Sequence, residues 1–149
     1  MSYKSVVKKS IDEDVLDIYR DSESVTLSDR GRRSLIKSNI LPEDASTTSI
    51  KLQYRVDTDQ VTEGKIATIS IHYTDTIAYL GHMSVQKGLR NQGIATEIIK
   101  NDFINYCSTN LGVSVIHGVA KSPEMESVFK RTGFTENSKS KGGWYSLEI

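Results

Sequence analysis

The sequence contains very little cysteine and proline, and it has no excess of either charge. Its 149 residues include one cysteine, Cys107, and two prolines. A single thiol excludes an internal disulfide framework and is typical of a reducing compartment. Lys plus Arg and Asp plus Glu both number 19, so the formal net charge is zero. That balance gives no overall electrostatic attraction to nucleic acid or to an anionic membrane, and we expect neither partner.

Long hydrophobic runs and clustered metal ligands are missing as well. The first nine residues, MSYKSVVKK, lack the apolar segment of a secretory signal, and no window approaches the ~18 apolar residues of a membrane span. No His and Cys residues have the spacing of metal ligands, so we expect no metal. The basic residues between 30 and 37 resemble the solvated face of a helix, without the interleaved aromatics of a nucleic-acid site. We therefore expect a cytoplasmic protein with one domain over 1–149.

Apolar periodicity divides the first half of the chain into short helices and strands. The capping box Ser10-Ile-Asp-Glu13 predicts a helix that runs through Tyr19, with a short strand over 3–7 before it. Ser28-Asp29 predicts the start of a second helix. Apolar residues at every second position then predict strands over 49–57, 65–73 and 77–85.

The second half contains the strongest helical pattern, over 91–110. A β-branched run at 113–119 predicts a buried strand, and Ser122-Pro123 predicts the start of a helix that ends at Gly133. A hairpin over 134–149 completes the order β-α-α-β-β-β-α-β-α-β-β. The unit from 77 to 119 predicts a parallel crossover, whereas short connections elsewhere predict antiparallel pairs. The sequence thus predicts a mixed α/β fold.

The join between the strand at 77–85 and the helix after it is the segment Arg90-Asn-Gln-Gly-Ile-Ala95. A helix N-terminus presents unpaired N–H groups and the positive end of the backbone dipole, which both favour a phosphate. Gly93 has no Cβ, and Ala95 is small, so a phosphate can approach the backbone closely. Taken alone, this pattern is more often an ordinary turn.

Two segments together resemble the GCN5-related N-acetyltransferase (GNAT) superfamily. Arg90-x-x-Gly93-x-Ala95 resembles its motif A, and the segment 122–134, which ends in a helix followed by Gly-Phe, resembles its motif B. The resemblance implies a mixed, mostly antiparallel sheet with a splayed parallel pair and about four flanking helices. It also implies an acetyl-CoA-dependent N-acetyltransferase that moves the acetyl group of this co-substrate directly to a primary amine of a small molecule or protein.

The resemblance implies a cofactor site along these two motifs. The pantetheine arm would pair with the strand backbone at Met83 and Val85. Motif B would contribute Ser122 and Phe129. The diphosphate would lie on motif A, which comprises Arg90, Asn91, Gln92, Gly93, Ile94, Ala95 and Thr96.

The chemistry fits the family less closely than the cofactor site does. Many family members carry a tyrosine four residues before the glycine of motif B, where it protonates the departing thiolate. Phe129 occupies that position and cannot donate a proton. An alternative function is therefore a non-catalytic acyl-CoA-binding module that acts through a protein partner.

Three side chains are candidates for the base that removes a proton from the amine. His117 lies five residues before Ser122, at a place where related N-terminal acetyltransferases carry a glutamate. His82 is next to the expected pantetheine contact. Tyr79 lies where histone-type relatives carry a glutamate. The acceptor stays unidentified, and a homodimer is expected only by analogy with relatives.

Overall fold

The structure is a computed structural model that describes residues 18–37, 47–56, 64–90, 93–136 and 143–149. The predicted strand over 3–7 and the capping box at 10–13 lie outside these ranges. The same holds for Asn91 and Gln92 of the predicted diphosphate loop and for residues 141–142 of the predicted hairpin turn.

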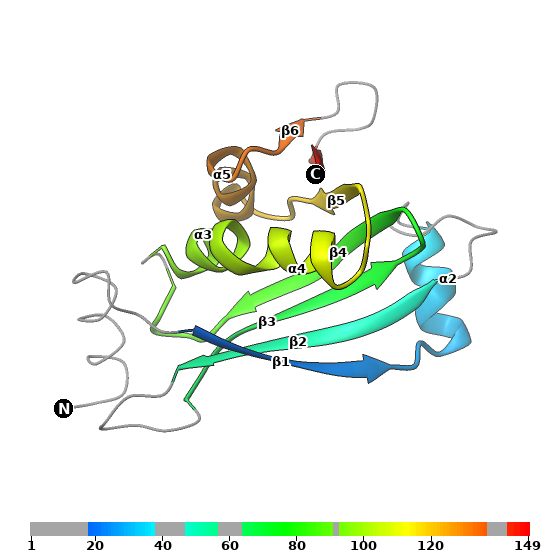
Figure 1. The fold of residues 1–149 in the computed structure, drawn as a ribbon, viewed down its shortest axis with the longest axis horizontal. Helices are drawn as coiled ribbons and strands as arrows, with labels where there is room; N and C mark the ends of the chain where they lie inside the picture. Colours follow the sequence, from blue (N-terminus) through cyan, green and yellow to red (C-terminus); the bar gives the residue numbers. More distant parts are fainter. Residues whose placement is uncertain (1–17, 38–46, 57–63, 91–92, 137–142) are drawn as a thin grey trace.

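A seven-stranded sheet forms the centre of the molecule (Figure 1). Its strands follow the order β1-β2-β3-β4-β5-β7-β6. Their bounds are β1 Ile18–Val25, β2 Thr48–Val56, β3 Gly64–Tyr73, β4 Ile77–Val85, β5 Val115–Val119, β6 Thr135–Glu136 and β7 Trp144–Glu148. Only β4 and β5 pair in parallel among the strands described, which confirms the predicted crossover.

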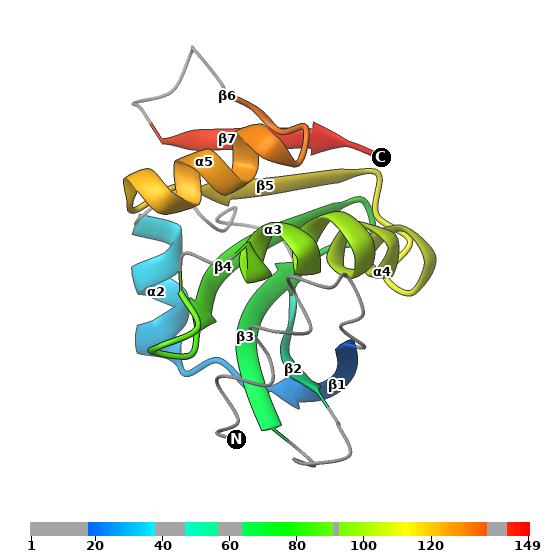
Figure 2. The ribbon, with the colours of Figure 1, turned by 90° about the vertical axis from the view of Figure 1, so that its left-hand side faces the viewer.

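Three helical stretches accompany the sheet in the described ranges. They are α2 (Asp29–Lys37), a continuous run of α3 (Ile94–Ile98), the π-helical turn η1 (Ile99–Phe103) and α4 (Ile104–Thr109), and finally α5 (Pro123–Arg131). Figures 1 and 2 place the α3–α4 run and α5 on one face of the sheet. We call the opposite face, on whose side α2 lies in Figure 2, the outer face.

The prediction that the first helix extends through Tyr19 is wrong. Ile18 and Tyr19 begin β1, which pairs antiparallel with β2 from Ile18–Val56 to Val25–Ser49. The strand is held to the helical layer through Arg20, whose Nη1 donates to both carboxylate oxygens of Asp102 at 2.6 and 2.8 Å. Pairing with β2 and this long-range ion pair override the local helical pattern.

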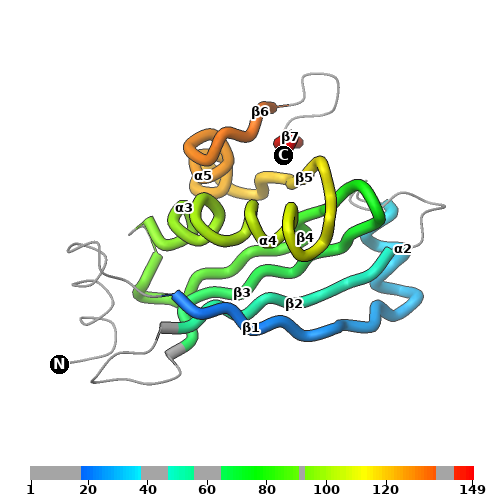
Figure 3. The backbone as a smooth tube through the Cα atoms, in the orientation of Figure 1, coloured from blue at the N-terminus to red at the C-terminus, as the bar shows by residue number. Residues whose placement is uncertain are grey.

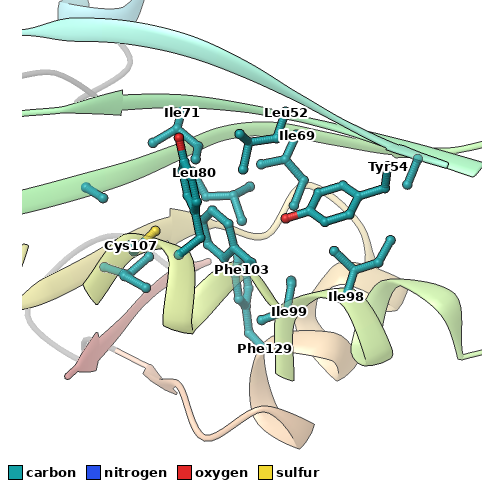
Figure 4. Packing of buried hydrophobic residues seen from close by; sticks show 14 of the residues in the cluster. Leu52, Tyr54, Ile69, Ile71, Leu80, Ile98, Ile99, Phe103, Cys107 and Phe129 are labelled. Atoms are coloured by element: carbon teal, nitrogen blue, oxygen red, sulfur yellow. The ribbon is translucent and has the colours of Figure 1, made fainter. Parts of the chain in front are cut away.

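The core lies between the sheet and the α3–α4 run (Figure 4). Leu52, Ile69 and Leu80 from three neighbouring strands face the helical layer, because every second strand residue points to the same side. The α3–α4 run packs against them with a buried stripe of Ile98, Ile99, Phe103 and Cys107. Burial raises the pKa of the Cys107 thiol to about 12, so this thiol is packed and unreactive at neutral pH.

Candidate functional site

The parallel strands β4 and β5 pair along only part of their length. The paired residues run from Ile77–Val115 to Leu80–Gly118. β5 ends one residue later at Val119, whereas β4 continues to Val85. The second half of β4 therefore has no neighbour on the β5 side, and the sheet opens there.

A β-bulge at Gly81 marks the point where the sheet opens. Ser70 of β3 pairs with His82, and the next residue, Ile71, pairs with Leu80, so Gly81 is the extra residue of β4. A Cβ at Gly81 would lie 2.6 Å from Nε2 of His72. Nδ1 of His72 is held at 2.8 Å by Oγ of Ser49, so the ring has little freedom to give way. Only glycine fits this bulge without a shift of the imidazole.

A groove of about 940 Å³ occupies the opening between the two strands. One wall is the unpaired half of β4 with the start of α3, and the other is the end of β5 with α5. The backbone trace in Figure 3 shows how the chain leaves β4, runs through α3 and α4, and returns along β5 to bring α5 beside α3. The predicted cofactor residues on this groove are Met83, Val85, Arg90, Gly93, Ile94, Ala95, Thr96 and Ser122.

Gly93, directly before α3, presents backbone rather than a side chain to the groove. Gly93 has φ of +81°, and a Cβ there would meet nothing within 4 Å, so the residue faces open space. The first intrahelical hydrogen bond runs from the N–H of Glu97 to the carbonyl of Gly93 at 2.9 Å. The N–H groups of residues 94–96 therefore precede the helical ladder. Arg90 closes the turn, because its Nε donates to the Val85 carbonyl at 3.0 Å.

The opposite wall carries the predicted Ser122 and two basic groups that the motifs did not predict. Ser122 caps α5, since its Oγ accepts from the N–H of Met125 at 3.1 Å. Lys121 and Arg131 also line the groove. Their positions depend on how α5 packs against α3, and the motif resemblance assigns no role to either residue. Sequence periodicity alone gives no signal that would select them from the other basic residues.

Several solved structures that resemble the chain are acetyltransferases. The chain aligns with the Agrobacterium tumefaciens C58 acetyltransferase at 16% identity and a TM-score of 0.54, covering 66% of this chain and 60% of that one. It aligns with the GNAT domain of S. lividans PAT at 15% identity and a TM-score of 0.51, covering 83% of this chain and 70% of that one. Campylobacter jejuni PseH in complex with acetyl coenzyme A gives 15% identity and a TM-score of 0.52, covering 88% and 98%.

The chain has the GNAT fold. No protein-family model and no curated protein sequence matches it. The resemblance seen in two short motifs is thus confirmed at the level of the fold. The sequence identity to these structures is too low to infer the substrate or the activity of this chain from them.

Phe129, at the position of the usual tyrosine in GNAT motif B, is enclosed in the core and is not among the residues that line the groove. Its side chain is 0% exposed. Its ring centroid lies 4.9 Å from that of Phe134 and 5.2 Å from that of Tyr145. A Cβ on Gly118 would lie 2.4 Å from Cζ of Phe129 and 3.0 and 3.3 Å from the two Cε atoms. The para carbon therefore points toward β5, into the space left by a glycine.

Two of the candidate bases of this GNAT fold meet on the outer face. Tyr79 and His117 are register partners on β4 and β5, and their ring centroids lie 5.5 Å apart. His117 also contacts Trp144 of β7, with centroids 6.3 Å apart, and its Nδ1 lies 2.7 Å from Oγ of Ser146. We call these four residues the outer cluster. Burial lowers the pKa of His117 below its ordinary value.

The third candidate, His82, is exposed and lines the groove rather than joining the outer cluster. The sequence showed His117 and Tyr79 as isolated residues, and it gave no sign of Trp144 or Ser146. Those two come from β7, which the sheet places beside β5 across a separation of about thirty residues. In the ranges that the structure covers, no group of three His, Cys, Asp or Glu residues could hold a metal ion. No helix of those ranges is long and apolar enough to cross a bilayer.

Proposed function

We propose that the chain binds acetyl-CoA in the groove between β4 and β5 and transfers the acetyl group directly to a primary amine. The observation that carries this proposal is the groove itself, which opens where strand pairing stops and ends at the bare backbone around Gly93. An adenine nucleotide diphosphate carries negative charge and many acceptor oxygens. The N–H groups of residues 94–96 and the positive end of the helix dipole favour such a group.

The groove also suits the rest of the cofactor. From Gly81 to Val85 the β4 edge that faces away from β3 has no strand partner in the described chain. An extended pantetheine arm has amides that can pair with such an edge as an added strand does. The Val85 carbonyl already accepts a hydrogen bond from Arg90, so this residue contributes to the turn as well as to the edge. Lys121 and Arg131 supply positive charge for the phosphates.

A pair of glycines provides a matched test of the diphosphate site. Gly93 and Gly112 have φ of +81° and +68°, a Cβ at either meets nothing within 4 Å, and they flank the same helical run. Only Gly93 lines the groove. Both Gly93→Ala and Gly112→Ala should cost about 1 kcal/mol of stability through backbone strain. We expect calorimetric titration of coenzyme A to show at least tenfold weaker binding for Gly93→Ala and unchanged binding for Gly112→Ala.

Equal affinity in the two variants, or no heat of binding with the unmodified protein, would contradict the cofactor site. Catalysis needs a separate measurement, namely release of the thiol from acetyl-CoA over a panel of amines, peptides and polyamines. Phe129 supplies no proton to the thiolate, which favours a second candidate function. In that function the chain is a non-catalytic module that binds acyl-CoA and acts through a protein partner. Coenzyme A binding without thiol release on any acceptor would favour that second function.

A further inference from the structure

The outer cluster lies one register position before the point where β4 and β5 separate. The last pair is Leu80–Gly118, and the pair before it is Tyr79–His117. Leu80 is buried on the helical side, so the alternation of strand side chains places Tyr79 and His117 on the outer face. A thioester at the end of the groove where β4 and β5 separate would therefore have the outer cluster one register position away, on the outer face.

The imidazole of His117 is held from one side only. Nδ1 lies 2.7 Å from Oγ of Ser146, which is the register partner of His117 on β7. Nε2 makes no hydrogen bond within the described part of the chain. The rings of Tyr79 and Trp144 stand on either side, with centroids 5.5 and 6.3 Å from that of His117. One ring nitrogen is thus fixed by the protein, and the other is left for a ligand.

This inference rests on the proposed function. We propose that Ser146 is a positioning residue that holds His117 as the Nδ1–H tautomer, so that Nε2 accepts a proton from an acceptor amine lying between Tyr79 and Trp144. In this tautomer Nδ1 donates to Ser146 Oγ, and the lone pair of Nε2 is free. The opposite tautomer would place a hydrogen on Nε2 and leave no base.

The chemical step balances with these groups. The ammonium form of the acceptor gives one proton to Nε2 of His117, and the neutral nitrogen attacks the thioester carbonyl carbon. A carbon–nitrogen bond forms, and the carbon–sulfur bond breaks with its electron pair remaining on sulfur. The second nitrogen proton passes to solvent. Water protonates the thiolate, because Phe129 has no proton to give.

The surrounding groups favour this role at neutral pH. Burial lowers the pKa of His117 and of His72, and burial raises the pKa of the Tyr79 hydroxyl, so all three are neutral near pH 7. The described carboxylate on the same side of β7 is the exposed Glu148, two residues from Ser146. Aromatic faces attract an ammonium group by about 0.5–2 kcal/mol, which suits Tyr79 and Trp144 as walls for a primary amine.

Nuclear magnetic resonance of the imidazole nitrogens tests the tautomer directly. The chain has three histidines, so long-range 1H–15N spectra are simple, and His117→Asn assigns the relevant signals. We expect the Nδ1–H form in the unmodified protein, the Nε2–H form in Ser146→Ala, and the Nδ1–H form again in Ser146→Thr. An Nε2–H form in the unmodified protein, or the same tautomer in Ser146→Ala, would overturn the proposal.

Turnover measured on the same variants tests the consequence. With saturating acetyl-CoA and tyramine or spermidine as the amine, we expect kcat to fall by about tenfold or more in Ser146→Ala and to recover in Ser146→Thr, at an unchanged KM for acetyl-CoA. Unaltered turnover in Ser146→Ala would overturn the proposal, and so would failure of the unmodified protein to acetylate either amine. Calorimetric binding of coenzyme A separates the two proposals, because it reports the groove alone.

Discussion

Phe129→Tyr, which introduces the tyrosine that many GNAT acetyltransferases carry at the corresponding motif position, should destabilise this protein rather than activate it. The para carbon of Phe129 points at Gly118, where even a Cβ would be at 2.4 Å. A hydroxyl on that carbon extends toward the β5 backbone. The ring cannot retreat easily, because Phe134 and Tyr145 pack against it at 4.9 and 5.2 Å.

The magnitude follows from two costs. Overpacking a filled core costs about 1–3 kcal/mol, and burying a hydroxyl without a partner costs about 1–3 kcal/mol. We expect a loss of at least about 2 kcal/mol, which lowers Tm by about 4–8 °C in a domain of this size. Gly118→Ala adds a methyl group to β5 that clashes with the same ring, so it should lower the free energy of unfolding by a similar amount. In Phe129→Met a flexible side chain replaces the ring, so adding Gly118→Ala to it should cost less than in the unmodified protein.

Differential scanning calorimetry gives the Tm values, and thiol release from acetyl-CoA gives the activity. We expect no faster release in Phe129→Tyr, since residue 129 does not line the groove. If Phe129→Tyr had the Tm of the unmodified protein or released thiol faster, the argument would be refuted that Gly118 leaves no room for a hydroxyl on this ring.

Two further predictions concern stability and are checked by urea unfolding. Asp102 accepts hydrogen bonds from Arg20 and, at 2.8 Å, from the hydroxyl of the fully buried Tyr54, so Asp102→Ala should lower the free energy of unfolding by about 1–3 kcal/mol. Asp102→Asn keeps an acceptor and should lower it by less. Equal losses in the two variants would contradict this prediction. Because burial holds the pKa values of His72 and His117 below 6.5, the unfolded chain takes up protons first on acidification. The contribution of these two histidines to the free energy of unfolding should therefore be fully present above pH 6.5 and should decrease as the pH falls below it. A free energy of unfolding that does not change over this range would contradict the lowered histidine pKa values.

The regular elements could be predicted because their side chains alternate or recur in the local sequence. The predicted strand over 77–85 matches β4, and Ser122-Pro123 marks the start of α5 as expected. Gly93 has the positive φ that favours glycine in the turn expected before the helix, and its predicted contact with a phosphate stays a prediction. Local chemistry determines each of these features, so the sequence is sufficient to predict them.

What the sequence could not predict depends on distant partners. Ile18 and Tyr19 carry a helical pattern, yet pairing with β2 turns them into an edge strand. The contact between His117 and Ser146 spans β5 and β7, and no spacing in the chain relates the two. The need for glycine at the bulge likewise comes from a neighbouring strand, since His72 occupies the space that a Cβ of residue 81 would take.

Two glycines together explain why the groove lies where it does. At Gly81 the missing Cβ leaves room for His72 on the outer face, and at Gly118 it leaves room for Phe129 on the helical face. Both lie within one residue of the last β4–β5 pair, so the sheet opens at a point that is packed from both sides. A groove fixed in this way is already formed before a ligand arrives, so little binding energy is lost to reorganisation. The same packing leaves no room for a hydroxyl at position 129, so in the proposed reaction the thiolate takes its proton from water.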